Sequence, residues 1–293
     1  MGPLLFLVYI NDLDDNLNNK IFKFADDTKL LGTVDKNTNV VSSIQDDLNK
    51  LMSWSEKWLM PFNTEKCRVM HYGNGNPCRE YFLNGVKMET STEEIDLGVL
   101  FSNDLKVEDQ CLKAAKSANK VLGMVKRTFQ CRNKKVMLIL YKTLIRPLLD
   151  YCIQVWRPYL KKDIEILEKI QKRLTKCIVE CKGLKYIERL KFLGLTSYET
   201  RCLRGDILTC LKAFNGFEYL NTSEMFAFSD RISRGHCLKL TKQACRLDVA
   251  KHSFAHRVIN VWNSLPNSVV ISDSVNAFKG GLDRHLRAVR GFE

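Results

Sequence analysis

Two adjacent carboxylates, Asp26 and Asp27, stand between two apolar runs in the stretch IFKFADDTKLL. Carboxylate oxygens are ligands that Mg²⁺ prefers, and a pair of such ions can clamp the attacking and leaving oxygens of a phosphoryl transfer. Neighbouring side chains on an extended chain point to opposite faces, so one carboxylate would bind metal well and the other only in part. A further carboxylate would have to come from another strand. The alternative is a polar hairpin turn, where Asp is common.

The elements that would position this pair are two short strands, predicted over residues 20–25 and 28–32 with both aspartates in the turn. A two-residue turn needs positive φ at its central residues, which strains an Asp-Asp pair. A short buried helix is predicted before the hairpin, beginning at Pro3. An amphipathic helix is predicted after it and should end before Pro61. Its apolar positions are Val41, Ile44, Leu48, Leu51 and Trp58.

Short strands and then helices are predicted further along the chain. KCRVMHYG is a strand candidate, EYFLNGVKM a hairpin turning at Asn84-Gly85, and EEIDLGVLFSNDLK one more strand. After Val107 the pattern becomes helical, with a bend or break at Pro147. The segment KDIEILEKIQKRLTKCIVE combines an apolar stripe with a basic face. The stripe is Ile164, Leu167, Ile170, Leu174 and Ile178, and the basic face is Lys161, Lys162, Lys169, Lys172, Arg173 and Lys176.

Charge is unevenly spread along the 293 residues, whose net charge is +13. Residues 1–110 carry 11 Lys/Arg and 18 Asp/Glu, residues 111–180 carry 17 and 5, and residues 181–293 carry 18 and 10. This distribution indicates a polyanion held by the basic part and cations held by the acidic part. The alternative is a solvated basic face, because many basic proteins bind no nucleic acid.

Several classes of protein and site are disfavoured by composition. The apolar start lacks the basic region and cleavage site of a signal peptide, and no apolar run reaches the roughly 18 residues of a membrane span. The 11 scattered cysteines favour a reduced, intracellular protein. Cys237, Cys245, His252 and His256 lack the short Cys-x₂₋₄-Cys step of zinc sites, so we do not expect zinc. The four tryptophans are expected in the core.

Several motifs, taken in order, carry a family resemblance. GPLLFLVYINDL, FADDTKLL, LMSWSEKWLMPFNTEKCRVMHYG and DLGVLFSNDLK resemble the later palm motifs of reverse transcriptases from non-LTR retrotransposons (LINE elements), closest to the Jockey-like and chicken-repeat-like branch. FADD resembles the family's catalytic [FY]-x-D-D turn, and FNTEKC the next motif, whose lysine is Lys66. LYKTLIRPLLDYCIQVW and the basic helix after it resemble the thumb, and the last part resembles the family's C-terminal tail. The resemblance covers essentially the whole chain.

The resemblance implies an α+β fold with a partial palm over residues 1–110, a helical thumb over 111–180 and a basic C-terminal region over 181–293. It implies RNA-directed DNA polymerisation by two-metal nucleotidyl transfer, with Mg²⁺ on Asp26 and Asp27. Lys66 would be a general acid or a clamp on the departing pyrophosphate; its alternative is a solvated lysine. The implied partners are an RNA template, a DNA primer and, in an active enzyme, a dNTP, with no membrane. The residues expected on nucleic acid are Lys126, Arg127, Arg132, Lys134, Lys135, Lys161, Lys162, Lys169, Lys172, Arg173 and Lys176.

The chain also departs from the family pattern. In the family, a Gln-Gly pair, the fingers, a third catalytic Asp and an endonuclease lie upstream of the segment that begins here at Gly2. We therefore expect a truncated chain without polymerase activity of its own. Five other carboxylates are interpreted as surface charges: Asp12, Asp14, Asp15, Asp46 and Asp47. Two other functions stay open, a catalytically dead nucleic-acid-binding fragment and a basic helical adaptor for protein partners. The expected location is intracellular, nuclear or cytoplasmic.

Overall fold

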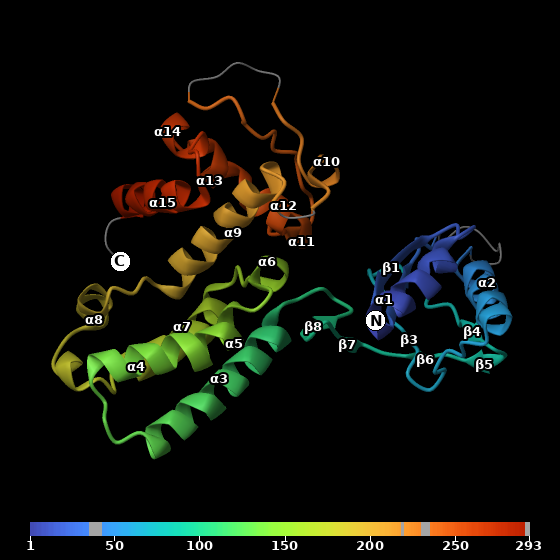
Figure 1. The fold of residues 1–293 in the computed structure, drawn as a ribbon, viewed down its shortest axis with the longest axis horizontal. Helices are drawn as coiled ribbons and strands as arrows, with labels where there is room; N and C mark the ends of the chain where they lie inside the picture. Colours follow the sequence, from blue (N-terminus) through green and yellow to red (C-terminus); the bar gives the residue numbers. More distant parts are fainter. Residues whose placement is uncertain (35–42, 218–219, 230–234, 291–293) are drawn as a thin grey trace. The chain divides into compact units, whose positions relative to one another are not determined.

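The computed structural model describes residues 1–34, 43–217, 220–229 and 235–290 (Figure 1). The chain divides into two compact units. Unit 1 comprises Met1–Ile95 and Phe101–Leu105, and unit 2 comprises Asp96–Leu100 and Lys106–Glu293. Helices dominate, and the described strands form four two-stranded sheets, so the predicted α+β class is confirmed.

The first part of the chain combines helices with short strands. Its elements are α1 (Gly2–Tyr9), the 3₁₀ helix η1 (Asn11–Asp14), β1 (Lys20–Phe24), β2 (Asp27–Leu31), α2 (Ser43–Trp58), β3 (Arg68–Val69), β4 (Phe82–Leu83), β5 (Val86–Lys87), β6 (Glu89–Thr90), β7 (Glu93–Asp96) and β8 (Val99–Ser102). β1–β2 and β4–β5 are antiparallel pairs, and β3 pairs with β6 in parallel. The division between the units falls at the sheet β7–β8.

The helix α1 forms as expected, with Pro3 in its first turn, but it is not buried. Leu4 and Val8 are 67% and 75% exposed, so the prediction of a buried helix is wrong. The apolar sequence made burial the natural expectation, but within unit 1 few apolar groups cover this helix. Burial begins only after the helix ends, at Ile10.

Unit 1 has a small core along one face of α2. Leu48 packs with Tyr81 and Leu83, and half-buried Leu30 and Ile44 contact this cluster. The predicted apolar face of the helix is thus confirmed for the described residues, while Val41 lies outside them. α2 ends at Trp58, before Pro61, as predicted.

Two hairpin turns follow α2, of which one was expected. Asn84 and Gly85 have φ of 52° and 71°, as the predicted turn between β4 and β5 requires. Leu97 and Gly98, between β7 and β8, have φ of 44° and 83°. The single strand predicted there is therefore two strands, because leucine in the first turn position gives no turn signal.

The second part of the chain is helical. Its elements are α3 (Glu108–Thr128), α4 (Lys134–Leu140), the π-helix η2 (Tyr141–Ile145), α5 (Arg146–Asp150), α6 (Ile153–Trp156), α7 (Lys161–Thr175), the 3₁₀ helix η3 (Val179–Cys181), α8 (Tyr186–Leu193), α9 (Tyr198–Phe214), α10 (Thr222–Met225), α11 (Asp248–Lys251), α12 (Phe254–Arg257), α13 (Ile259–Ser264), α14 (Asn267–Val270) and α15 (Val275–Arg290). Pro147 lies in the first turn of α5, directly after the π-helix, so the predicted interruption is confirmed.

Unit 2 has a large core, in which α9 packs against the C-terminal helices. Trp262 on α13 is fully buried among Ile207 of α9 and Phe278 and Leu282 of α15. Trp156 is also buried, as expected. Trp54 and Trp58 in unit 1 are only half-buried, so the expectation for these two is wrong.

Candidate functional site

The aspartate pair lies at the β1–β2 hairpin, but the turn of this hairpin begins one residue earlier than predicted. Asp27 is the first residue of β2 and pairs with Phe24, so the two turn residues are Ala25 and Asp26. Of these two, Ala25 has a φ of 50°. The unfavourable positive φ therefore falls on alanine rather than on an aspartate.

Both carboxylates are exposed, and the sheet face that Asp27 shares combines apolar side chains with the lysines Lys20 and Lys29. Asp27 lies opposite Phe24, and alternate residues along the strands place Phe22 and Leu31 on the same face. The apolar side chains of Phe22, Phe24 and Leu31 are 51% to 62% exposed. The pair is thus presented on an open surface of unit 1.

The opposite face of the hairpin is anchored by Lys23. Its ammonium donates to the carbonyl oxygens of Ile10 (3.2 Å) and Asn11 (3.1 Å) and forms an ion pair with Asp14. The hydrogen bond from Lys23 lowers the pKa of Asp14. Because Lys23 uses carbonyls at the end of α1 and in η1, it fixes the hairpin that carries the aspartates.

Two carboxylates interpreted as surface charges have structural partners instead. Asp12 accepts hydrogen bonds from the indole nitrogens of Trp54 (2.8 Å) and Trp58 (3.1 Å). Asp47 on α2 is fully buried, and its oxygens accept from the backbone nitrogens of Asn18 (3.0 Å) and Asn19 (2.8 Å). The surface interpretation is wrong for Asp47. The described contacts give both carboxylates structural roles.

Lys66 is exposed in the connection between α2 and β3. Its backbone nitrogen donates to the carbonyl oxygen of Asn63 at 3.1 Å. Its role toward pyrophosphate stays a prediction.

No additional metal-ligating side chain lies beside Asp26 and Asp27 in the part of the chain that the structure describes. No group of three or more His, Cys, Asp or Glu residues there is arranged to hold a metal ion. Of the Cys/His set considered for zinc, His252 instead stacks on Tyr159 with ring centroids 4.1 Å apart. Asp26 and Asp27 therefore remain the candidate carboxylates, with metal binding as a prediction.

α7 has the two faces that its sequence predicts. Leu167, Ile170 and Leu174 are buried on one side, and Ile178 is buried just beyond the helix. Ile164 is half-buried. All six basic residues of the predicted basic face are exposed: Lys161, Lys162, Lys169, Lys172, Arg173 and Lys176. The helix thus presents a row of cations on the surface of unit 2.

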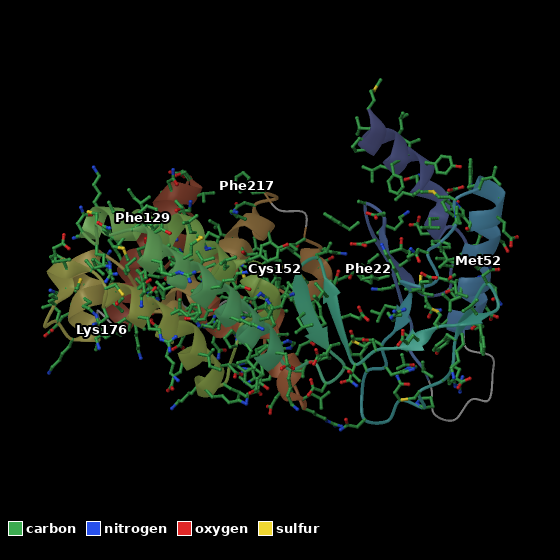
Figure 2. All side chains as sticks on the ribbon, turned by 90° about the horizontal axis from the view of Figure 1, so that it is seen from below. Phe22, Met52, Phe129, Cys152, Lys176 and Phe217 are labelled. Carbon is green, nitrogen blue, oxygen red and sulfur yellow. The ribbon has the colours of Figure 1, made fainter. Side chains whose placement is uncertain are left out.

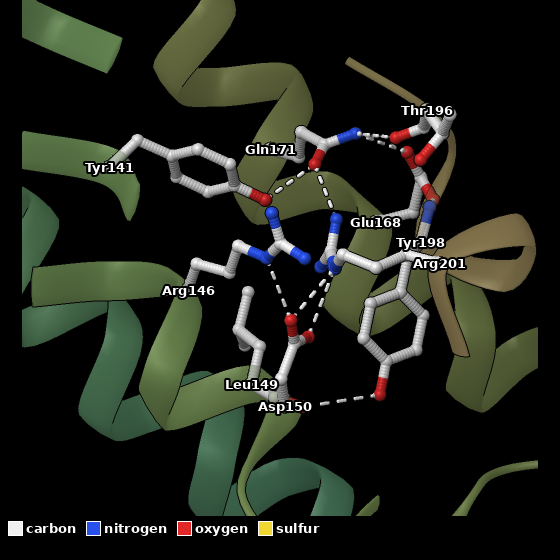
Figure 3. Close-up of polar contacts among 9 residues, drawn as sticks. All are labelled: Tyr141, Arg146, Leu149, Asp150, Glu168, Gln171, Thr196, Tyr198 and Arg201. Atoms are coloured by element: carbon white, nitrogen blue, oxygen red, sulfur yellow. Dashed lines mark hydrogen bonds and ion pairs between the residues drawn. The ribbon is translucent and has the colours of Figure 1, made fainter. Parts of the chain in front are cut away.

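A buried polar network holds the inner side of α7 (Figure 3). Gln171 accepts from the Tyr141 hydroxyl and from Nη1 of Arg201 (2.8 Å), and it donates to the carbonyl oxygen of Thr196 (2.9 Å). Nε of Arg201 donates to both oxygens of Asp150 (3.0 Å). Burial raises the pKa of Tyr141 to about 12, so the hydroxyl stays a donor. The network ties α7 to η2, α5 and α9 and so fixes the direction of its basic face.

Other residues predicted on nucleic acid have contacts inside the protein. Lys134 donates from Nζ to the carbonyl oxygen of Phe192 at 2.7 Å. Lys162 forms an ion pair with Glu108 at 2.6 Å, which raises the lysine pKa. Arg132 donates to the carbonyl oxygen of Lys126 at 3.2 Å. Their contact with nucleic acid stays a prediction.

None of the helices that the structure describes is both long enough and apolar enough to cross a membrane.

Comparison with known proteins identifies two curated relatives from Drosophila melanogaster. The chain is 23% identical over 190 residues to the RNA-directed DNA polymerase from mobile element jockey, covering 61% of this chain and 21% of that protein. It is 23% identical over 206 residues to the probable RNA-directed DNA polymerase from transposon BS, covering 62% of this chain and 22% of that protein. The chain thus spans 21–22% of the length of these relatives. No family model matches, and no solved structure matches. The predicted relationship to non-LTR retrotransposon polymerases is confirmed.

Proposed function

We propose that this chain, a relative of mobile-element RNA-directed DNA polymerases, performs the nucleic-acid-holding part of reverse transcription. Unit 2 would hold an RNA template paired with a DNA primer, and unit 1 would present Asp26 and Asp27 for Mg²⁺. The observation that carries the proposal is the exposed basic face of α7, on the opposite side of the helix from the buried Leu167, Ile170 and Leu174.

The α7 face suits a ligand recognised by its backbone. Lysine and arginine side chains neutralise phosphates and release condensed counterions, whatever the base sequence. A polymerase must hold every template it copies, so sequence-independent phosphate contacts are the appropriate kind. The network of Gln171 and Arg201 keeps the helix in one position, so the cations can match a regular row of phosphates.

The β1–β2 hairpin offers carboxylate oxygens, the kind of ligand atom that Mg²⁺ prefers. Asp26 and Asp27 are exposed carboxylates on a hairpin fixed by Lys23, and Mg²⁺ commonly takes one or two protein carboxylates while keeping waters and substrate phosphates. When bound, the ions would supply charge stabilisation to a phosphoryl transfer. The two aspartates would hold and orient them, and Lys66 would offer a proton or a positive charge to the departing pyrophosphate.

The α7 face can be tested by charge reversal. In the Lys161→Glu/Lys169→Glu variant we expect the affinity for a blunt RNA–DNA hybrid to fall by about tenfold or more. The slope of log affinity against log salt should shrink by about two, because each of the two lysines neutralises one phosphate. Fluorescence anisotropy of the full chain at several salt concentrations measures both quantities.

A matched control places the same charge change on unit 1, as Lys57→Glu/Lys87→Glu. We expect this variant to bind the hybrid within about twofold of the parent chain, since exposed charges on another surface act only through screened, long-range fields. A hybrid affinity of the parent chain that does not depend on salt would contradict phosphate binding. It would favour an adaptor for protein partners.

Polymerase activity is expected to be absent from the purified chain. Because no third carboxylate joins Asp26 and Asp27 among the described residues, we expect no Mg²⁺-dependent dNTP addition to a hybrid that the chain binds. A primer-extension assay on a recessed hybrid measures this. Incorporation that disappears in Asp26→Ala, while hybrid affinity stays unchanged, would show that the chain has a complete active site.

A further inference from the structure

A second basic surface lies at one end of unit 2, where residues 126–135 meet residues 176–192. We call it the bundle-end surface; it combines the α3–α4 connection with the end of α7, η3 and α8 (Figure 1). The backbone nitrogen of Val179 donates to the carbonyl oxygen of Arg132 (3.0 Å), and that of Lys134 donates to Glu180 (3.0 Å). These contacts make the two segments one continuous surface.

The charged residues of the bundle-end surface are mostly cationic. Its two segments contain ten basic residues and two acidic ones, Glu180 and Glu188. Both acids bind backbone nitrogens at helix N-termini, Glu180 that of Lys134 and Glu188 that of Lys185 (2.7 Å). Their charge is therefore partly offset by the helix ends rather than by the surface lysines. The basic residues are Lys126, Arg127, Arg132, Lys134, Lys135, Lys176, Lys182, Lys185, Arg189 and Lys191.

Aromatic rings are exposed within this positive surface. Phe129, at the end of α3, is 37% exposed, and Phe192 on α8 is 43% exposed. The ammonium of Lys134 lies 4.2 Å from the centroid of the Phe192 ring and holds it in place. Figure 2 shows Phe129 and Lys176 at the same end of the unit.

The combination of basic residues with exposed phenylalanine rings favours single-stranded over double-stranded nucleic acid. A duplex buries the faces of its bases by stacking them on each other, so it offers phosphates to lysines but no base face to an exposed phenylalanine. A single strand offers both, and base stacking on aromatic side chains together with cations along the backbone is the usual way in which it is bound. The α7 face combines cations with no exposed aromatic ring of its own, and the bundle-end surface has both features.

We propose that the bundle-end surface binds a single-stranded nucleic-acid segment, with bases stacked on Phe129 and Phe192 and phosphates held by the surrounding lysines and arginines. The inference deepens the proposed function and rests on it, since an unpaired template or displaced strand is the natural ligand beside a hybrid. It assigns to unit 2 a second nucleic-acid site, which differs from the α7 face in the form of strand it recognises.

The test uses the full chain and a 12-nucleotide oligouridylate, whose bases stack weakly on each other, beside the blunt RNA–DNA hybrid. In Phe129→Leu/Phe192→Leu, which keeps apolar bulk and removes both rings, we expect oligouridylate affinity to fall by about tenfold or more. Hybrid affinity should change by less than about twofold. Phe217→Leu, an exposed phenylalanine elsewhere on unit 2, is the matched control and should leave both affinities unchanged.

A second variant guards against misfolding of the first. Lys182→Glu/Lys185→Glu leaves the rings in place, and it should also weaken oligouridylate by about tenfold and reduce its salt slope. Oligouridylate that does not bind, or that binds equally well to the leucine variant, would overturn the proposal. So would oligoglutamate that competes as well as oligouridylate, because the surface would then be a general anion binder. If the hybrid still binds through the α7 face in those cases, the proposed function stands while this inference fails.

Discussion

Replacement of Asp206 by alanine is expected to destabilise unit 2 by about 3–5 kcal/mol, the cost of breaking a buried ion pair from one side. Asp206 on α9 is fully buried. It pairs with Nη1 of Arg157 (2.7 Å) and with Nε and Nη2 of Arg257 (both 2.9 Å). The two arginine side chains are only 13% and 12% exposed, so the alanine variant leaves two almost buried cations without their shared carboxylate. Denaturant unfolding followed by circular dichroism measures the destabilisation.

The control is a more exposed ion pair between α9 and α15. Arg204 and Asp283 form an ion pair in which the side chains are 32% and 39% exposed. We expect Asp283→Ala to cost less than about 1 kcal/mol, since solvent screens an exposed pair. A destabilisation by Asp206→Ala no larger than that by Asp283→Ala would contradict the assigned importance of the buried cluster.

The Asp206 cluster also bears on how unit 2 unfolds. It joins Arg157, which precedes α7, to α9 and to Arg257 on α12, so it connects chain segments on both sides of residue 180. We therefore expect the regions 111–180 and 181–293 to unfold in one transition. Their treatment as separate domains stays a prediction from sequence.

Replacement of Asp47 by alanine is expected to destabilise unit 1 by about 3 kcal/mol, since each hydrogen bond to a charged group contributes about 1.5–3 kcal/mol. The carboxylate binds the backbone nitrogens of Asn18 and Asn19 and the side-chain amide of Asn19 (2.8 Å), and it forms an ion pair with Lys50. Without it, the exposed contacts of Ser43 with Asn19 (3.2 Å) and of Lys50 with the Asn16 carbonyl oxygen (2.6 Å) would still join α2 to the segment that enters β1, but the buried connection would be lost. Hydrogen exchange of α2, followed by mass spectrometry, measures the change in stability.

The exposed neighbour Asp46 provides the control, and Asp46→Ala should change stability by less than about 0.5 kcal/mol.

The pH dependence of stability provides a second measurement of the role of Asp47. Burial raises the pKa of Asp47, but the hydrogen bonds from Asn18 and Asn19 outweigh it, and the net pKa is lowered. Its contribution is therefore present above the unfolded pKa of about 3.9 and is lost as pH falls through the folded pKa. The stability difference between parent and Asp47→Asn chains should thus begin to shrink as pH falls below about 4 and disappear below the folded pKa, and a difference that does not shrink with falling pH would contradict this role.

Local patterns predicted much of the fold and of the candidate site. The apolar stripe and basic face of α7 followed from helical spacing, and Asn84-Gly85 from turn chemistry. The hairpin that carries Asp26 and Asp27 was also predicted, but one residue out of register. A pattern of alternating residues does not say which two residues form the turn, and here alanine takes the positive φ.

Long-range polar partners were beyond sequence reasoning. Asp47 looks like any helix-surface aspartate, because its partners Asn18 and Asn19 lie 29 and 28 residues away. Gln171 likewise lies beside an apolar stripe that gives no sign of the network around it. Such groups are buried only because tertiary contacts satisfy them, and those contacts leave no local periodicity.

The π-helix at Tyr141–Ile145 has a consequence for spacing. Met137, Tyr141, Ile145 and Leu149 recur at intervals of four residues, and all four are buried. In a regular α-helix each such step turns the side chain by roughly 40° around the axis, so the last would point about 120° away from the first. A wider π turn slows that rotation and lets one side of the rod keep facing inward. Deletion of a single residue within 141–145 would therefore restore regular winding while Met137 and Leu149, then one residue closer, would still face nearly the same side, about 20° apart.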